Sequence, residues 1–300
     1  MDRIYCIYNP NADNNRGEEN AYDIAVLYPY GKIEFADIRK ITDYNKFFES
    51  KDKTDTVIIC GGDGTLNRFV NDIKDTKINC ELLYCATGSG NDFLRDLEKT
   101  SEPVMLKKYI TDLPTVTVNG EKRSFINGVG YGIDGYCCEE GERIRKKHPS
   151  KKINYTSIAI KGLLFHYKPK NAKVTVDGKE YFFRKVWICP TMVGRYYGGG
   201  MMPTPMQKRE DRKNKASVLV FFGSGKLKTL MIFPSLFNGT HTKHTKNCTV
   251  LEGKHIKVEF DKPTPLQIDG EVIENVTSYE VEVACNKNIS KVNETIWESK

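Results

Sequence analysis

Residues 55–73, DTVIICGGDGTLNRFVNDI, join a short apolar strand to a helix through a glycine-rich turn. The strand covers residues 57–60, and the turn is GGDGT at 61–65. Apolar residues at i, i+3, i+4 and i+7 predict the helix, and these are Leu66, Phe69, Val70 and Ile73. Asn67, Asn71 and Asp72 are then expected to face away from that apolar side.

The GGDGT turn is typical of a phosphate-binding loop. Gly61, Gly62 and Gly64 would let the backbone take conformations closed to other residues and approach a ligand closely. The free N–H groups of the new helix would point at an anion. Asp63 would repel a bare phosphate, so it suits a divalent cation or its waters lying between carboxylate and phosphate. An ordinary tight turn is the alternative, but the whole motif favours a metal–nucleotide complex.

Length and composition bound the class of protein. At 300 residues the chain is expected to form two domains, and its 28% charged residues are ordinary for a globular protein. No apolar run approaches the ~20 residues of a membrane span, and the charged opening at Asp2 and Arg3 is unlike a secretion signal. Nine irregularly spaced cysteines predict free thiols in a reducing compartment. We therefore expect a cytoplasmic protein.

The net charge of +7 indicates an anionic partner, either lipid headgroups or nucleic acid. Basic residues concentrate in four places, at 143–147, 151–152, 226–228 and 243–246. Each cluster taken alone is more often a solvated lysine-rich face than a binding site.

The pattern of the first ~120 residues, in which short apolar strands alternate with helices, predicts an α/β domain with a parallel sheet. The expected strands are 4–8, 33–38, 57–60 and 82–86. Three polar or glycine-rich loops follow three of these strands, at Asn9-Pro10, at GGDGT and at residues 87–92. Ligands sit beyond the carboxyl ends of such strands, so these loops should converge on one edge.

From about residue 115 the pattern changes to short runs of β-formers separated by turns such as Asn119-Gly120 and Asp177-Gly178. The expected strands are 115–118, 173–176, 186–189, 218–222, 256–260 and 279–284. We predict a β-rich, antiparallel, sandwich-like domain at 121–300 after an α/β domain at 1–120, leaving open whether the last residues return to the first domain. One helix is expected at 155–167, with Ile158, Leu163 and Leu164 facing inward.

Two further stretches carry candidate functional residues. In TGSGNDFL (87–94), Thr87, Ser89 and Asn91 can donate to phosphate or ribose oxygens, and Gly88 and Gly90 permit close backbone approach. Asp92 is equally suited to cap a helix at 93–97 or to take part in catalysis. In LQIDGEV (266–272), the simplest interpretation is a type I′ hairpin with an exposed Glu271. The alternative is a carboxylate that accepts the proton of an attacking hydroxyl.

Five motifs in order closely resemble the bacterial diacylglycerol kinase and related lipid kinases, with their sphingosine kinase relatives. They are GGDGTLN (61–67), GSGNDF (88–93), FINGVGYGID (125–134), GRYYGGGM (194–201) and QIDGE (267–271). GGDGT also occurs in NAD kinases, but the later motifs are features of lipid kinases.

The resemblance implies a two-domain lipid kinase that uses ATP and Mg²⁺ in a cleft between the domains. It implies that Glu271 is the proton acceptor, that Asp63 serves the metal–phosphate complex, and that Asp92 supports the site rather than only capping a helix. The nucleotide site it implies consists of Asn9, Gly61, Gly62, Asp63, Gly64, Thr65, Asn67, Thr87, Gly88 and Asn91.

Two segments depart from the family pattern. After Asn9-Pro10 the family usually has a small residue, Ser, Gly and a basic residue in that order, whereas residues 11–17 here read NADNNRG, so phosphate contacts from this loop stay open. At 208–215 basic residues replace an acidic stretch that holds a structural Mg²⁺ in relatives. Asp211, beside Glu210, is the only candidate ligand left, and its cationic neighbours oppose a tightly bound metal.

The resemblance favours diacylglycerol as the acceptor and a peripheral contact with an anionic membrane, with no nucleic-acid partner. A homodimer stays open. The alternatives are a kinase of a sphingoid base, another long-chain alcohol or NAD, and a nucleotide-binding regulator without turnover. The intact Asp63 and Glu271 argue against loss of catalysis.

Overall fold

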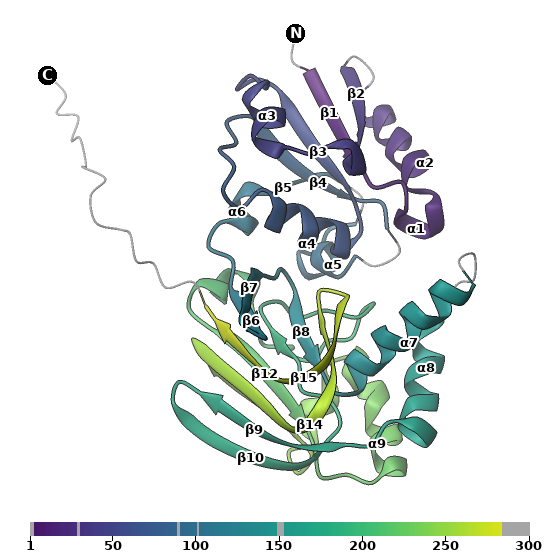
Figure 1. Ribbon diagram of the computed structural model, residues 1–300, viewed down its shortest axis with the longest axis vertical. Coiled ribbons are helices and arrows are strands. Elements are labelled where there is room, and N and C mark those ends of the chain that lie inside the picture. The colour runs from purple at the N-terminus through teal and green to yellow at the C-terminus, as the bar shows by residue number, and fades with distance from the viewer. Residues whose placement is uncertain (1–2, 29–30, 89–90, 101, 149–152, 284–300) are drawn as a thin grey trace, which may run out of the picture.

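The computed structural model describes residues 3–28, 31–88, 91–100, 102–148 and 153–283. The N-terminal part of the chain is built on one sheet and the C-terminal part on a second, larger sheet (Figure 1). The question of whether the last residues return to the first domain concerns residues 284–300, which lie outside the described ranges.

The first sheet has the strand order β2-β1-β3-β4-β5. Its strands are β1 (Arg3–Tyr8), β2 (Lys32–Asp37), β3 (Thr56–Gly61), β4 (Glu81–Ala86) and β5 (Val104–Met105). The first four pair in parallel, and the short β5 pairs antiparallel with β4 at the edge. The four strands predicted from the sequence are thus confirmed.

Helices cover both faces of this sheet, because β1, β3 and β4 are apolar on both sides. They are α1 (Ala12–Asn15), α2 (Gly17–Tyr22), α3 (Tyr44–Glu49), α4 (Asp63–Asp72), α5 (Asp92–Asp96) and α6 (Lys107–Ile110). The predicted helix after GGDGT is α4, and it buries Leu66, Phe69 and Val70 against the sheet.

The second sheet is antiparallel and carries the core of the C-terminal part. Its strands are β6 (Thr115–Val118), β7 (Glu121–Ser124), β8 (Gly128–Tyr131), β9 (Lys170–Val176), β10 (Lys179–Val186), β11 (Thr191–Met192), β12 (Ala216–Phe221), β13 (Cys248–Gly253), β14 (His255–Ile268) and β15 (Glu271–Glu282). The turns at Asn119-Gly120, Asp177-Gly178 and Asp269-Gly270 have positive φ at both residues, as a type I′ turn requires. The predicted fold class is confirmed. The strand expected at 186–189 is wrong, since β10 ends at Val186 and Ile188 makes only isolated bridges.

Three helices pack beside this sheet: α7 (Ile133–Lys147), α8 (Tyr155–Lys161) and α9 (Lys226–Ile232) (Figure 1). The helix predicted at 155–167 is α8 continued by a π-helical turn, Gly162–His166. Leu163 is buried as expected, whereas Ile158 and Leu164 are only partly buried. Among the residues that the structure describes, no helix is both long enough and apolar enough to cross a membrane.

Candidate active site

A cavity of about 1220 Å³ lies between the two domains, and residues of both domains line it. The first domain contributes loops that follow its parallel strands, at the edge where the sequence predicted a ligand. Eight of the residues predicted for the site line this cavity, namely Asn9, Gly62, Asp63, Gly64, Thr65, Gly88, Asp92 and Glu271. The structure therefore brings the N-terminal glycine turn and the C-terminal hairpin to one space.

Four predicted nucleotide-site residues, Gly61, Asn67, Thr87 and Asn91, are not in the described cavity wall. Gly61 ends strand β3, and the Asn67 side chain bonds across to the second domain. Buried oxygens of Thr87 and Asn91 have no hydrogen-bond partner among the described residues. Ser89 and Gly90 lie outside the described ranges.

Within GGDGT, Gly61 is needed for close packing rather than for an unusual backbone angle. None of Gly61, Gly62 and Gly64 has a positive φ, which corrects the sequence-based expectation. A Cβ on Gly61 would lie 2.5 Å from the Thr65 Cβ. A Cβ on Gly88 would lie 2.7 Å from the Gly62 Cα, so only glycine lets the two loops touch. The N–H groups of the first turn of α4 have no partner within the helix, which makes this part of the wall a suitable phosphate-binding site. We call this site, formed by the Gly62–Thr65 turn, the phosphate seat.

Asn9, at the carboxyl end of β1, forms one side of the phosphate seat. Its Nδ2 donates to Thr65 Oγ1 at 2.9 Å, and its Oδ1 accepts from the Asn11 N–H at 3.0 Å. Arg39 and Arg68, which sequence reasoning missed, also line the cavity and bring positive charge to the phosphate side. Nothing in the local sequence distinguishes them from other surface arginines.

Asp63 lies next to Asp92, and it is Asp63, not Asp92 as expected, that caps α5. Both oxygens of Asp63 accept from the start of α5, from Asp92 N–H at 2.8 Å and Phe93 N–H at 3.0 Å. Asp63 is thus the residue that caps α5. Asp92 does not cap its own helix, because its carboxylate accepts from Gly199 N–H of the second domain at 2.8 Å. Burial, followed by the charge of Asp92, raises the pKa of Asp63 to about 6.

Asp269 joins the two domains and was not recognised from the sequence. Its carboxylate accepts from the backbone N–H groups of Ile126 at 2.6 Å and of Asn127 and Gly128 at 2.9 Å. Asn67 Nδ2 of α4 reaches the same carboxylate at 2.6 Å. Asn67 and its neighbour Asn71, which bonds Ser124, therefore face the second domain rather than solvent.

Glu271, the predicted proton acceptor, is the first residue of β15. Its Oε2 lies 2.7 Å from Arg123 Nη1, and 47% of its side chain is exposed. The hairpin interpretation is therefore right about the turn and about exposure. The glutamate also lines the cavity, and its role as proton acceptor stays a prediction.

The second-domain side of the cavity is largely apolar. Seven lining residues from α7, α8, the segment between β11 and β12 and the segment after α9 provide this surface, namely Ile133, Cys137, Tyr155, Ala159, Met201, Phe233 and Phe237. Asp134 lies at the inner end of this apolar slot, with Gln267 Nε2 donating to its Oδ2 at 2.9 Å. The arrangement gives a polar end near the phosphate seat and an apolar end that suits a hydrocarbon chain.

Asp134 gives a testable dependence of stability on pH. Burial raises its pKa to about 7, well above the ~3.9 of an unfolded chain. A raised pKa means that its stabilising contribution is present below about pH 4 and is lost as the pH rises through about 7. Asp134→Asn should therefore lose less unfolding free energy than the wild type between pH 5 and pH 8, as measured by urea denaturation. Asp75→Asn, an exposed site, is the control, and equal slopes in both variants would contradict the expectation.

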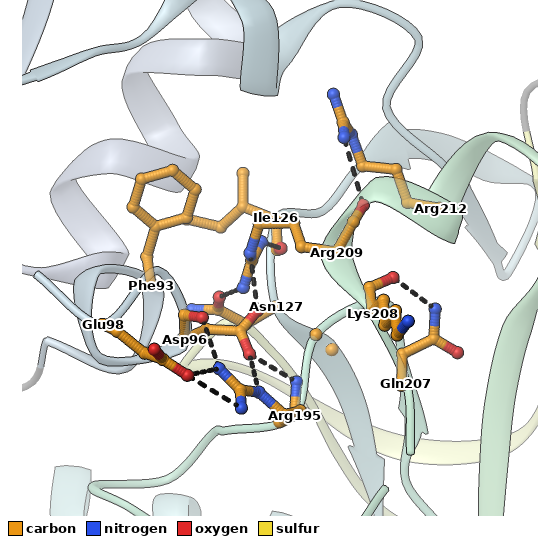
Figure 2. A network of polar contacts seen from close by, with 12 residues as sticks. Phe93, Asp96, Glu98, Ile126, Asn127, Arg195, Gln207, Lys208, Arg209 and Arg212 are labelled. Atoms are coloured by element: carbon orange, nitrogen blue, oxygen red, sulfur yellow. Dashed lines mark hydrogen bonds and ion pairs between the residues drawn. The ribbon is translucent and has the colours of Figure 1, made fainter. Parts of the chain in front are cut away.

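A second polar cluster, the Arg209 cluster (Asp96, Asn127, Arg195 and Arg209), connects the two domains (Figure 2). Arg209 is 3% exposed; its Nε donates to Asp96 Oδ2 at 2.7 Å and its Nη2 to Asn127 Oδ1 at 2.8 Å. Its Nη1 donates to the Ile126 carbonyl. Arg195 Nε bonds the other oxygen of Asp96 at 2.9 Å.

The Arg209 cluster is relevant to whether Asp211 could hold a metal ion. Asp211 lies in a 3-10 turn, Arg209–Lys213, whose two arginines are buried. Within the described ranges, no group of three or more His, Cys, Asp or Glu side chains could hold a metal ion. The donors around Asp211 do not fit a tightly held ion, because the segment supplies a guanidinium where carboxylates would be needed. The assignment of Asp211 stays a prediction from the sequence.

Two family models cover the chain. The diacylglycerol kinase catalytic domain matches residues 3–119, and the YegS C-terminal NAD kinase beta sandwich-like domain matches residues 127–286. The chain belongs to the bacterial diacylglycerol kinase and lipid kinase family. This lipid kinase family member is a phosphotransferase of the lipid kinase type.

Curated relatives of this lipid kinase family member include proteins that are 22% to 27% identical to it over the matched stretches. "Putative lipid kinase YtlR" of Bacillus subtilis is 22% identical over 241 residues, which is 74% of this chain and 75% of the relative. "Diacylglycerol kinase" of Mycobacterium tuberculosis is 25% identical over 199 residues, which is 63% of this chain and 62% of the relative.

A solved structure shows the same fold. "Crystal structure of a putative diacylglycerol kinase from Bacillus anthracis str. Sterne" has a TM-score of 0.64 and 21% identity, and the match covers 94% of this chain and 92% of that one. The likeness extends over both domains of this family member.

Proposed function

We propose that this protein transfers the γ-phosphoryl group of ATP to the hydroxyl of diacylglycerol or a similar membrane lipid. One observation carries the proposal. A single cavity joins the phosphate seat of the first domain, the Glu271 carboxylate and the apolar slot of the second domain. A phosphate donor and a lipid acceptor both fit this space, and their reacting ends would meet at its polar middle.

The residues present fit a nucleotide with its metal. The Gly62–Thr65 turn, Asn9, Arg39 and Arg68 would bind the phosphates through N–H groups and positive charge. Mg²⁺ bound with ATP would neutralise charge on the phosphate oxygens, and it usually takes only one or two protein carboxylates. Asp63, which is half-buried, and Asp92, which is buried, both line the cavity wall and would serve it directly or through water.

The reaction requires little covalent chemistry from the protein beyond positioning. The lipid hydroxyl oxygen forms a bond to the γ-phosphorus as the bond to the β–γ bridging oxygen breaks, and ADP leaves. Glu271 takes the hydroxyl proton, and its Oε1 is available for this while Oε2 pairs with Arg123. The apolar slot excludes water from the acyl side, which limits hydrolysis of ATP.

The membrane supplies the acceptor, so the protein must reach a bilayer surface. The basic clusters at 143–147, 226–228 and 243–246 would attract anionic lipid headgroups, and binding should weaken as salt is added.

Labelled ATP with a panel of acceptors tests the function. With Mg²⁺ present, we expect radiolabel in phosphatidic acid when diacylglycerol is the acceptor, and less label in sphingosine, a long-chain alcohol or NAD. Label in NAD alone would overturn the lipid assignment. No label in any acceptor, with ATP still bound, would instead leave a nucleotide-binding regulator.

A further inference from the structure

Three large apolar side chains are exposed on neighbouring elements of the second domain. Phe165, in the π-helical turn, is 73% exposed, and Leu227 and Met231 of α9 are 74% and 81% exposed. Leu227 and Met231 lie four residues apart, so they share one side of α9. Single exposed apolar residues are common, but three gathered in one place indicate an interaction surface.

Contacts between the two elements hold these side chains together. Helix α9 packs against the π-helical turn, and Lys226 Nζ donates to the Leu164 carbonyl at 2.6 Å. Ile160 of α8 and Phe237 after α9 are 39% and 38% exposed, and they lie on elements that contact the π-helical turn and α9, respectively. We call this surface the docking face, and it consists of Ile160, Phe165, Leu227, Met231 and Phe237.

The charge on the elements of the docking face has one sign. Lys161, Lys226 and Lys228 are exposed on the same elements. Residues 143–176 and 212–251, which include all of these elements, contain no Asp or Glu in a chain with 39 acidic residues. Glu140 of α7 is a carboxylate that shares a surface groove with these elements, where it lies with Lys161 and His166. An apolar surface whose own elements carry only cations complements the interface of an anionic bilayer, where apolar groups enter the acyl boundary and lysines meet phosphates.

The docking face also meets the cavity. Phe237 belongs to the docking face and also lines the apolar slot. Two buried residues next to the face line the slot as well: Phe233 of the same turn, and Ala159 of α8, which precedes Ile160. An acyl chain that left the bilayer here would enter the slot without passing the polar phosphate seat.

We propose that the docking face inserts into the interface of an anionic membrane and opens the apolar slot toward the bilayer. The proposal rests on the lipid kinase function given above and names the surface through which its substrate arrives. Phe165, Leu227 and Met231 enter the acyl boundary, and Lys161 and Lys228 contact the headgroup phosphates.

Vesicle flotation with matched variants tests the docking face. The vesicles are phosphatidylcholine with about 30% phosphatidylglycerol, chosen to give a negative surface potential. Phe165→Asp and Met231→Asp should each lower the fraction bound by about tenfold, since each loses one buried apolar side chain and adds a repelled charge. Lys228→Glu should lower it by about fivefold or more. Phe182→Asp is the control, because Phe182 is 74% exposed but lies on β10.

Turnover of detergent-dispersed diacylglycerol is measured on the same variants and should stay near the wild-type rate. If Phe165→Asp and Phe182→Asp float alike, the docking face is wrong even though the kinase assignment stands. If the wild type phosphorylates no lipid, the proposed function fails, and flotation still decides whether this face binds membranes. A dimer in solution that Phe165→Asp dissociates would assign the face to a second copy of the chain and overturn the proposal.

Discussion

Glu271→Gln should lower kcat for lipid phosphorylation by about 10²–10⁴-fold, the usual loss when a general base is removed. The amide keeps the size of the side chain and can still meet a hydroxyl, but it cannot take a proton. Glu271 lies at the exposed start of β15, so the substitution should leave the fold intact. KM for ATP should change little, because the phosphate seat is on the first domain.

A neighbouring glutamate makes this measurement specific. Glu274→Gln changes an exposed residue of the same strand and should keep the wild-type rate. Arg123→Met removes the partner of Glu271 and should cost less than Glu271→Gln, because the carboxylate itself remains. If Glu271→Gln keeps a rate within about threefold of the wild type, the base lies elsewhere, and Asp63 and Asp92 are the next two carboxylates of the cavity wall to test.

The elements that the sequence predicts well are those whose signal is local. Strand β3 with helix α4 is one, since apolar spacing and glycine position both depend on near neighbours. The type I′ hairpins are another, because Asn-Gly and Asp-Gly pairs accept positive φ wherever they occur. Helix α7 was not predicted, since its buried residues include Asp134, Gly135 and Gly141 and so lack apolar periodicity.

The residues that join the domains could not be predicted because their partners are remote in sequence. Asp269 is a good turn residue in its own right, and nothing local shows that it binds the backbone at 126–128. Asp92 shows the same limit, since its position favours a cap while its partner is Gly199. Arg209 sits among other basic residues at 208–215, and only the fold reveals that it is buried.

Arg209→Met should lower the free energy of unfolding by about 3–5 kcal/mol, the usual cost of breaking a buried ion pair by removing one partner. Arg209 satisfies Asp96, Asn127 and the Ile126 carbonyl at once, and all three would lose a donor inside the protein. Arg195 still bonds Asp96, which keeps the loss from being larger. Urea unfolding followed by circular dichroism measures the change.

Arg143→Met is the matched control, because Arg143 pairs with Glu140 on the surface of α7 and its removal should change the free energy of unfolding little. Arg209→Lys tests whether charge alone suffices. A lysine cannot reproduce the planar fork that reaches three acceptors, so it should recover only part of the loss. If lysine recovered the full free energy of unfolding, the Arg209 cluster would need a cation but no particular geometry.

Urea denaturation also distinguishes whether a guanidinium group or a metal ion connects the two domains at this cluster. If Arg209 supplies the cation that holds Asp96 and Asn127, chelation of divalent ions should leave the urea midpoint of the wild type unchanged. Arg209→Met combined with Asp96→Asn should then be less destabilised than the sum of the single variants, because the double variant leaves no unpaired buried charge. Additive losses, or a midpoint that falls on chelation, would show that the two domains are held by something other than this arginine.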